Sequence, residues 1–284
     1  MAAEMLYLAA KRPAALEEIE IVLLLEGILR RYGFDFRDYA RSSLRRRLLE
    51  CARGEKVRTL SGLQEKVLHD PEVFDRLITA ISVNVTTLFR NPTFYRTFRS
   101  KVAPLMRGNR RLRVWHVACA TGEEVYSMAV TLHEEGLSAR TQVYATDIHE
   151  APIVKAAQGS FSLARLQAAE LSYKAAGGKA RLSDYYTVEG GQGVFRPELR
   201  RNIVFASHNP TTDASFNEFD AILCRNVLPY FNERLKGRVH RLIYDSLART
   251  GFLGLGRGED LRLTPFEPRY AVVDGANGLF QKLR

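Results

Sequence analysis

The chain has 284 residues, of which 46% are hydrophobic and 26% charged, a composition typical of a globular protein with about two domains. Disordered, collagen-like and disulfide-stapled classes are therefore excluded. The longest apolar run, residues 19–29, contains two glutamates and is shorter than the ~20 residues of a membrane span, so no membrane insertion is expected. Three distant cysteines without a CxxC pair indicate neither a disulfide framework nor a metal site, and they favour a reducing, cytoplasmic location.

Basic residues outnumber acidic residues by 42 to 32, which gives a net charge of +10. The surplus is concentrated in residues 30–58, which hold ten basic and four acidic residues. Such a segment favours an acidic partner. Nucleic acid is not the expected partner, because neither aromatic interleaving nor a known binding module accompanies the charge.

The first hundred residues show helical periodicity, and no strand pattern occurs before residue 110. The turn signals Tyr32-Gly33 and Asp70-Pro71 separate the apolar segments. Helices are expected at residues 17–31, 39–53, 59–69 and 72–81. We therefore predict a small all-helical N-terminal domain, residues 1–90, that carries the basic segment.

From residue 112 onward, strand-like apolar runs alternate with helical segments. Strands are expected at residues 112–119, 141–145, 202–206, 219–224 and 251–256, helices at 123–135, 151–158 and 235–247, and a final hairpin at 270–273 and 279–283. This pattern predicts an α/β domain, residues 91–284, with a Rossmann-like, mostly parallel sheet and an antiparallel C-terminal hairpin. A Gly-rich stretch, 183–197, indicates a small antiparallel β insertion within residues 181–205.

In a doubly wound sheet, ligands bind at the carboxyl ends of the strands. The first strand is followed by ACATGEE, residues 118–124, where small residues allow close approach and a helix N-terminus offers free N–H groups. Glu123 and Glu124 would repel a pyrophosphate, and the chain has no GxGxxG, so a dinucleotide is disfavoured. Asp147 ends the second strand, where such folds bind ribose hydroxyls. These features favour S-adenosylmethionine, although a structural turn with a helix-capping acid explains them equally well.

A polar Arg225-Asn226 pair directly follows the buried strand 219–224. Polar groups at such a position are costly unless they are satisfied, so the pair either binds a ligand or ties neighbouring loops together. Pro229 disfavours a helix here and leaves Tyr230 on an irregular segment.

Four segments, in order, resemble motifs of the CheR family of chemotaxis protein methyltransferases: SVNVTTLFRNPTFY, WHVACATGEEVYSMA, YATDI and FDAILCRNVLPYF. The resemblance runs from about residue 20 to the end. It implies a cytoplasmic, S-adenosylmethionine-dependent enzyme that methylates glutamate side chains of bacterial chemoreceptors and releases S-adenosylhomocysteine. The cofactor-binding residues that it implies are Asn84, Thr86, Arg90, Glu123, Glu124, Asp147, Asn209, Pro210, Arg225 and Asn226.

The resemblance places Arg90 and Tyr230 nearest the reacting methyl group, as the catalytic residues. A glutamate carboxylate is already an adequate nucleophile, so the reaction needs an in-line, desolvated approach rather than a strong base. Arg90 and Tyr230 would supply a cation and a hydrogen-bond donor for the entering carboxylate. Arg90 could instead hold the carboxylate of the cofactor.

The resemblance also gives the basic segment a role, because the N-terminal domain of the family docks on the acidic helical cytoplasmic region of chemoreceptors. The residues expected to dock are Arg41, Arg45, Arg46, Arg47 and Arg53. A solvated basic helix steadied by its own ion pairs is the alternative. Within this helix only Arg46 has an acid, Glu50, four residues on, so most of the charge is expected to be unpaired. A monomer is the expected state.

Several positions depart from the family pattern: Leu88, His149, Pro210, Pro229 and residues 249–251. None removes a required polar contact, so activity is expected. Two other functions remain open at this point. One is the same chemistry on a carboxylate of another protein, and the other is a non-catalytic adaptor that binds S-adenosylmethionine.

Overall fold

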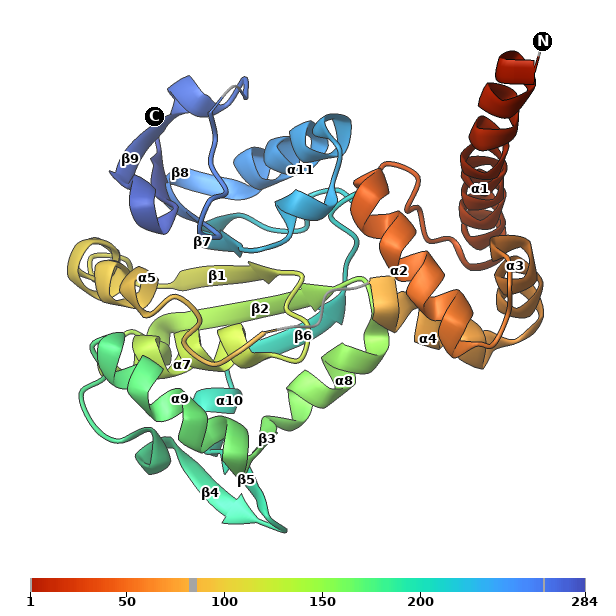
Figure 1. Ribbon diagram of the computed structural model, residues 1–284. Helices are drawn as coiled ribbons and strands as arrows, with labels where there is room; N and C mark the ends of the chain where they lie inside the picture. The colour runs from red at the N-terminus through yellow and green to blue at the C-terminus, as the bar shows by residue number, and fades with distance from the viewer. Residues whose placement is uncertain (1, 82–85, 263, 284) are drawn as a thin grey trace. The chain divides into compact units, whose positions relative to one another are not determined.

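The computed structural model describes residues 2–81, 86–262 and 264–283 (Figure 1). The chain forms two compact units, one of Met1–Val83 with Tyr230–Leu235 and the other of Asn84–Pro229 with Lys236–Arg284. The sequence placed a boundary after residue 90, whereas the structure divides the chain after Val83. The difference arises because Leu88 and Phe89 are buried in the core of the second unit.

The first unit is helical, as the periodicity predicted. Its helices are α1 (Ala2–Tyr32), α2 (Arg41–Gly54), α3 (Leu60–His69) and α4 (Pro71–Ile81). Thr59 caps α3 by accepting a hydrogen bond from the Gly62 N–H, and Pro71 supplies the fixed φ that suits a first helical residue. Leucine and isoleucine side chains from all of these helices make the core, including Ile21, Leu24, Ile28, Leu48, Leu63 and Leu77.

A short segment from late in the chain, residues 230–235, completes the first unit. Phe231 forms an antiparallel bridge with Tyr39, and their rings meet edge to face at 5.1 Å. The Ala40 N–H donates to the Tyr230 carbonyl at 2.7 Å, and the Asn232 N–H donates to the Asp38 carbonyl at 2.9 Å. The helical unit is therefore not contiguous in sequence.

The second unit is built on a seven-stranded sheet of order β6-β2-β1-β7-β8-β10-β9. Its strands are β1 (Leu112–Val117), β2 (Thr141–Asp147), β6 (Ile203–Ser207), β7 (Phe219–Cys224), β8 (Leu247–Leu255), β9 (Tyr270–Asp274) and β10 (Leu279–Lys282). The strand pairs β6–β2, β2–β1, β1–β7 and β7–β8 are parallel. Strand β10 pairs antiparallel with both β8 and β9. The mostly parallel sheet with an antiparallel ending is thus confirmed. Strand order reverses between β1 and β7, the position at which such sheets bind ligands.

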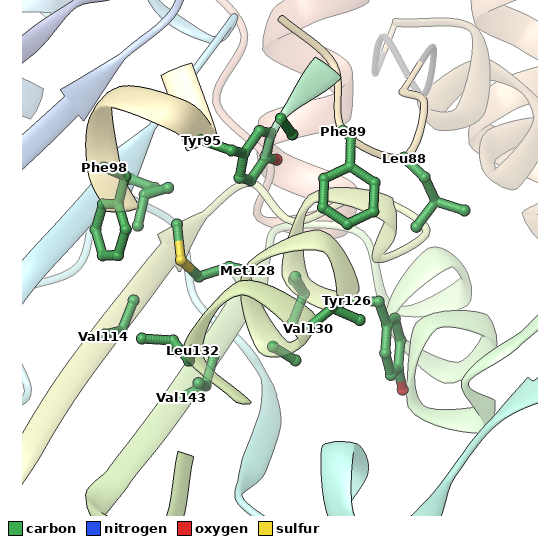
Figure 2. Close-up of a cluster of buried hydrophobic side chains, with 14 of the residues drawn as sticks. Leu88, Phe89, Tyr95, Phe98, Val114, Tyr126, Met128, Val130, Leu132 and Val143 are labelled. Carbon is green, nitrogen blue, oxygen red and sulfur yellow. The ribbon is translucent and has the colours of Figure 1, made fainter. Parts of the chain in front are cut away.

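Helices cover the sheet, and side chains from one of them, α7, form part of the buried cluster in Figure 2. They are α5 (Pro92–Thr97), α6 (Ala103–Met106), α7 (Glu123–Glu134), α8 (Glu150–Gln158) and α11 (Glu233–Ser246). Side chains of α7, including Met128 and Leu132, lie together with Val114 of β1 and Val143 of β2 (Figure 2). This packing fixes α7 against β1 and β2. No described helix has the length and apolar character that crossing a membrane requires.

The small β insertion is antiparallel, as predicted, but its limits differ. Its sheet has the order β3-β5-β4, with β3 (Ser160–Ser162), β4 (Tyr186–Glu189) and β5 (Gln192–Phe195), and helix α9 (Leu163–Ala175) separates β3 from β4. The range 181–205 misses β3, and it includes residues 203–205, which pair with β2 in the large sheet. Aromatic packing explains the position of β3, because Phe161 and Phe195 both contact the ring of Tyr126.

Candidate functional site

The loop after β1 is tightly constrained. Ala118, Ala120 and Gly122 all have positive φ, at 55°, 48° and 90°. A Cβ on Gly122 would lie 2.9 Å from the Ala156 Cβ, so glycine is required there. The Cys119 N–H donates to the Thr146 carbonyl at 2.8 Å, which ties the loop to β2. Small residues in left-handed conformation therefore lead directly into the N-terminus of α7.

Asp147 joins this loop to the end of β2. Its Oδ2 accepts the Ala120 N–H at 2.9 Å, and its Oδ1 accepts the His149 N–H at 3.0 Å. Burial raises the pKa of Asp147, while these two N–H groups oppose the shift. Each carboxylate oxygen has lone pairs beyond these bonds, so Asp147 can still accept the hydroxyls of a ribose.

Glu124 and Arg225 form an ion pair at the reversal of strand order. The Arg225 Nη1 lies 2.8 Å from the Glu124 Oε2, and the His116 Nδ1 lies 3.0 Å from the Glu124 Oε1. The Arg225 side chain is 1% exposed and that of Glu124 19% exposed. Burial would raise the pKa of Glu124, but the charge of Arg225 and the hydrogen bonds from His116 and Arg225 hold it below its usual value.

Arg225 also ties neighbouring segments together, one of the two roles foreseen for it. Its guanidinium lies 4.1 Å from the centre of the Phe94 ring, and its Nη2 donates to the Arg90 carbonyl at 3.2 Å. Its buried Nε has no hydrogen-bond partner in the part of the chain that the structure describes. A donor at this place can serve a bound polar group.

Glu123, the residue before Glu124, has partners other than Arg225. Its carboxylate accepts the Thr121 hydroxyl at 2.6 Å and the Arg165 Nη1 at 3.0 Å, and the side chain is only 2% exposed. Burial raises the pKa of Glu123, which Thr121 and Arg165 partly offset. The two adjacent glutamates thus have different partners, and Glu123 connects the loop to α9 of the insertion.

Glu259 was not foreseen from the sequence, yet it holds the loop after β7. Its carboxylate accepts the N–H groups of Asn226 at 2.8 Å and Leu228 at 3.1 Å, and that of Gly256. Asn226 has a φ of 63°, and these bonds stabilise that left-handed conformation. A Cβ on Gly256 would lie 2.4 Å from the Glu259 Oε2, so the close approach needs glycine. The sequence signal that could have indicated this role is the Gly-x-Gly-Glu run of residues 256–259, directly after β8.

Replacing Glu259 with glutamine is expected to destabilise the sheet unit by about 1–3 kcal/mol, because an amide N–H₂ would face at least one backbone N–H and leave it unsatisfied. Urea unfolding of the variant measures this cost. Glu198→Gln, at an exposed position in the first turn of a short helix (Pro197–Arg200), is the matched control. Equal stability of the two variants would contradict the role of Glu259.

The remaining predicted cofactor residues have different surroundings. Asn84 lies outside the described residues, and Thr86 is half-buried. Arg90 is exposed, on a turn in which its N–H donates to the Thr87 carbonyl at 3.3 Å. Asn209 uses its Oδ1 to accept the N–H and hydroxyl of Thr211, at 3.0 and 2.7 Å, and Pro210 between them is buried.

Tyr230, the second residue expected to be catalytic, belongs to the helical unit. The Arg47 guanidinium lies 4.7 Å from the centre of its ring. Arg47 itself is 8% exposed and donates to the Ile81 carbonyl. Arg47 thus has an internal structural role.

The expectation that the basic helix is mostly unpaired is wrong. Arg41 pairs with Glu18 at 2.9 Å, Arg45 pairs with Glu17, and Arg46 pairs with Glu50 at 3.3 Å. The acids that neutralise the first two are on α1, outside the helix itself. All of these pairs are largely exposed, so each contributes about 0–1 kcal/mol and can be exchanged for another partner.

The carboxyl ends of β1, β2 and β7 fit an adenosyl amino acid. Asp147 suits a ribose, the Glu124–Arg225 pair matches an amino-acid group that carries both charges, and the small residues 118–122 leave the backbone accessible. This fold and this site define the class of S-adenosylmethionine-dependent methyltransferases.

Comparison with known proteins identifies the family. The profile of "CheR methyltransferase, SAM binding domain" matches residues 84–272, and that of "CheR methyltransferase, all-alpha domain" matches residues 19–82. The chain belongs to the CheR methyltransferase family, and its cofactor is S-adenosylmethionine.

Several relatives match along most of their length. Cher3 of Pseudomonas putida is 40% identical over 265 residues, which cover 93% of this chain and 97% of Cher3. A protein named chemotaxis protein methyltransferase from Listeria innocua is 29% identical, with 87% of this chain and 92% of its own covered. Chemotaxis protein methyltransferase 1 of Pseudomonas aeruginosa is 28% identical, with 74% and 77% covered.

Proposed function

We propose that this chain is a protein-glutamate O-methyltransferase that methylates glutamate side chains in the cytoplasmic helices of chemoreceptors. The observation that carries the proposal is the match to chemotaxis protein methyltransferases over most of both chains. Those matches extend over a helical unit as well as the cofactor domain, as expected for a shared protein substrate. The enzyme would act in the cytoplasm, where those helices lie.

The bound cofactor supplies a sulfonium methyl group, which is the electrophile. Asp147 would hold the ribose hydroxyls, using the lone pairs that Ala120 and His149 leave available. Glu124 stays ionised at neutral pH because its pKa is lowered, and together with Arg225 it would orient the amino-acid end. The loop of residues 118–122 is already fixed in conformation, so little ordering is needed on binding.

Arg90 and Tyr230 would receive the substrate carboxylate. The Arg90 side chain is exposed, and Arg225 holds its backbone by donating to the Arg90 carbonyl at 3.2 Å. A guanidinium and a phenol hydroxyl both donate to a carboxylate and can align one oxygen for attack. No strong base is required, since the nucleophile is ionised at neutral pH.

The docking role remains assigned to Arg41, Arg45, Arg46 and Arg53, and Arg47 is removed from it because it is buried. A Glu-rich helix can replace Glu17, Glu18 and Glu50 as the partner of these arginines. Such an exchange gains little affinity at high salt and favours fast association at low salt.

Replacing Asp147 with alanine is expected to weaken cofactor binding by ~1.5–3 kcal/mol, the contribution of a hydrogen bond to a charged group. Calorimetric titration with S-adenosylhomocysteine measures the change, and thermal unfolding checks that the variant still folds. Asp147→Asn retains an acceptor and should recover part of the affinity. Cofactor affinity equal to that of the native chain would exclude a hydrogen bond between Asp147 and the ribose.

Methyl transfer to receptor fragments tests the proposed function directly. Labelled S-adenosylmethionine is incubated with the chain and cytoplasmic receptor fragments from the same source, and the product is then treated with alkali. Label released as volatile methanol identifies a carboxyl methyl ester. Tight cofactor binding without label on the receptor would leave the family assignment intact and contradict the substrate.

A further inference from the structure

A hollow rich in arginine lies at the opposite end of the sheet from Glu124 and Asp147. It has a volume of about 470 Å³ and is found where β1 and β2 begin. Its charged lining residues are Arg110, Arg111, Arg113 and Arg140. All four side chains are exposed to solvent at the rim of the hollow.

The sheet brings these arginines together from two separate segments. Leu112 pairs with Thr141 in the parallel β1–β2 ladder, so Arg111 and Arg140 directly precede paired residues at the same edge. Arg113 lies opposite Gln142 on the neighbouring strand. The cluster is therefore fixed by the register of the sheet.

Hydrogen bonds also hold the backbone of the loop in place. The Arg113 N–H and the Asn109 side-chain amide donate to the two carboxylate oxygens of Asp220, at 2.8 and 2.9 Å. The Arg140 Nη1 donates to the Arg107 carbonyl at 3.0 Å. The hollow is thus a preformed feature, which lowers the ordering cost of binding.

Arg41, Arg45 and Arg46 of α2 have acidic partners, whereas the four guanidinium groups of the hollow have none in the part of the chain whose side chains the structure describes. No ion pair joins any of them to a carboxylate among residues 16–81, 86–262 and 264–283. Asp220, the acid bound to this loop, is engaged by neutral N–H donors. Several like charges in one concavity repel one another and attract anions, so the cluster is suited to a ligand of high negative charge.

We propose that this hollow binds a small ligand carrying two or more phosphate groups. Guanidinium forks match phosphate oxygens in pairs, and four of them suit a polyphosphate better than a single carboxylate. The volume is within the range of small-molecule sites, and its concave form favours such a ligand over a protein surface. Gln142, Tyr144 and Asn202 add polar groups beside the arginines, as a nucleotide would require.

This site is independent of the proposed methyl transfer. The cofactor residues lie at the carboxyl ends of the strands, and the hollow lies at their amino ends. A ligand in the hollow would therefore not compete with S-adenosylhomocysteine.

The test is calorimetric titration of the full chain, saturated with S-adenosylhomocysteine, with pyrophosphate, ADP and adenosine at one fixed ionic strength. Pyrophosphate and ADP are expected to bind and adenosine is not. Equal affinities for the two phosphates identify free polyphosphate as sufficient, and at least tenfold tighter binding of ADP identifies a nucleotide. Both of these outcomes support the proposal.

Two variants that lose the same positive charge distinguish binding in this hollow from general electrostatic attraction of phosphate to the chain. The triple change Arg110→Ala, Arg111→Ala and Arg113→Ala is expected to weaken pyrophosphate binding at least about 100-fold. The matched control replaces three exposed arginines elsewhere in the same unit, Arg96, Arg196 and Arg249, and should change it less than about threefold. Equal weakening in both variants, or no binding of either phosphate to the native chain, would overturn the proposal.

Discussion

Replacing Glu124 with glutamine is expected to lower the free energy of unfolding of the sheet unit by roughly 3 kcal/mol. The variant leaves the Arg225 guanidinium, whose side chain is 1% exposed, without a counter-charge. Because Glu124 keeps 19% of its side-chain surface exposed, water compensates part of the loss, and the effect falls at the lower end of the range for buried pairs. Urea unfolding of the native chain and the variant gives the difference.

The pH dependence of that difference is a second, independent readout. The pKa of Glu124 lies below its usual 4.5 in the folded chain, so the ion pair contributes stability above that pH and loses it as the pH falls through the lowered value. The two proteins should therefore converge in stability at acidic pH. Asp184→Asn removes a charge from the exposed pair with Arg181 and should cost about 0–1 kcal/mol. An equal loss of unfolding free energy in Glu124→Gln and Asp184→Asn would contradict the larger stabilising effect of the buried ion pair.

Replacing Arg90 with alanine is expected to reduce methyl transfer by at least about 100-fold, the effect of removing one charged donor from a reacting site. The fold should be retained, since the Arg90 side chain is exposed while its carbonyl, which Arg225 binds, is unaffected by the substitution. Initial rates with labelled S-adenosylmethionine and thermal unfolding curves measure the two quantities.

The kinetic constants of this variant distinguish the two roles of Arg90. A fall in kcat with unchanged cofactor affinity indicates contact with the substrate carboxylate, and weaker cofactor binding indicates contact with the cofactor carboxylate. Arg96→Ala, an exposed arginine on α5, is the control and should retain full activity. Near-normal turnover by Arg90→Ala together with unchanged cofactor affinity would exclude both roles.

The strands that carry the site could be predicted because their sequence signal is local. Residues 219–224 form β7 as expected, since an apolar run broken only by Asp220 near its start is buried on both faces of the sheet. The strand predicted at residues 112–119 ends at Val117, because Ala118 turns into the left-handed region. Residues 160–175 lack a clear apolar period, and β3 and α9 were missed for that reason.

The partners within the site could not be predicted, because they are distant in sequence. Arg225 is 101 residues from Glu124, and Asn226 is 33 residues from Glu259. Arg45 similarly pairs with Glu17 on another helix, which spacing along α2 alone does not reveal. The motifs identified which polar residues belong to the site. Only the fold shows that Glu123 pairs with Arg165 whereas Glu124 pairs with Arg225.

The late segment of the helical unit has a consequence for synthesis of the chain. The Asn232 side-chain amide donates to Asp38 across a separation of 194 residues. A ribosome that adds ~5–20 residues per second needs roughly 10–40 s to cover that distance. During this interval α1–α4 emerge, while Phe231, which packs on Tyr39, has not yet been added. The part of the protein that is translated first is thus completed only when most of the sheet has already left the ribosome.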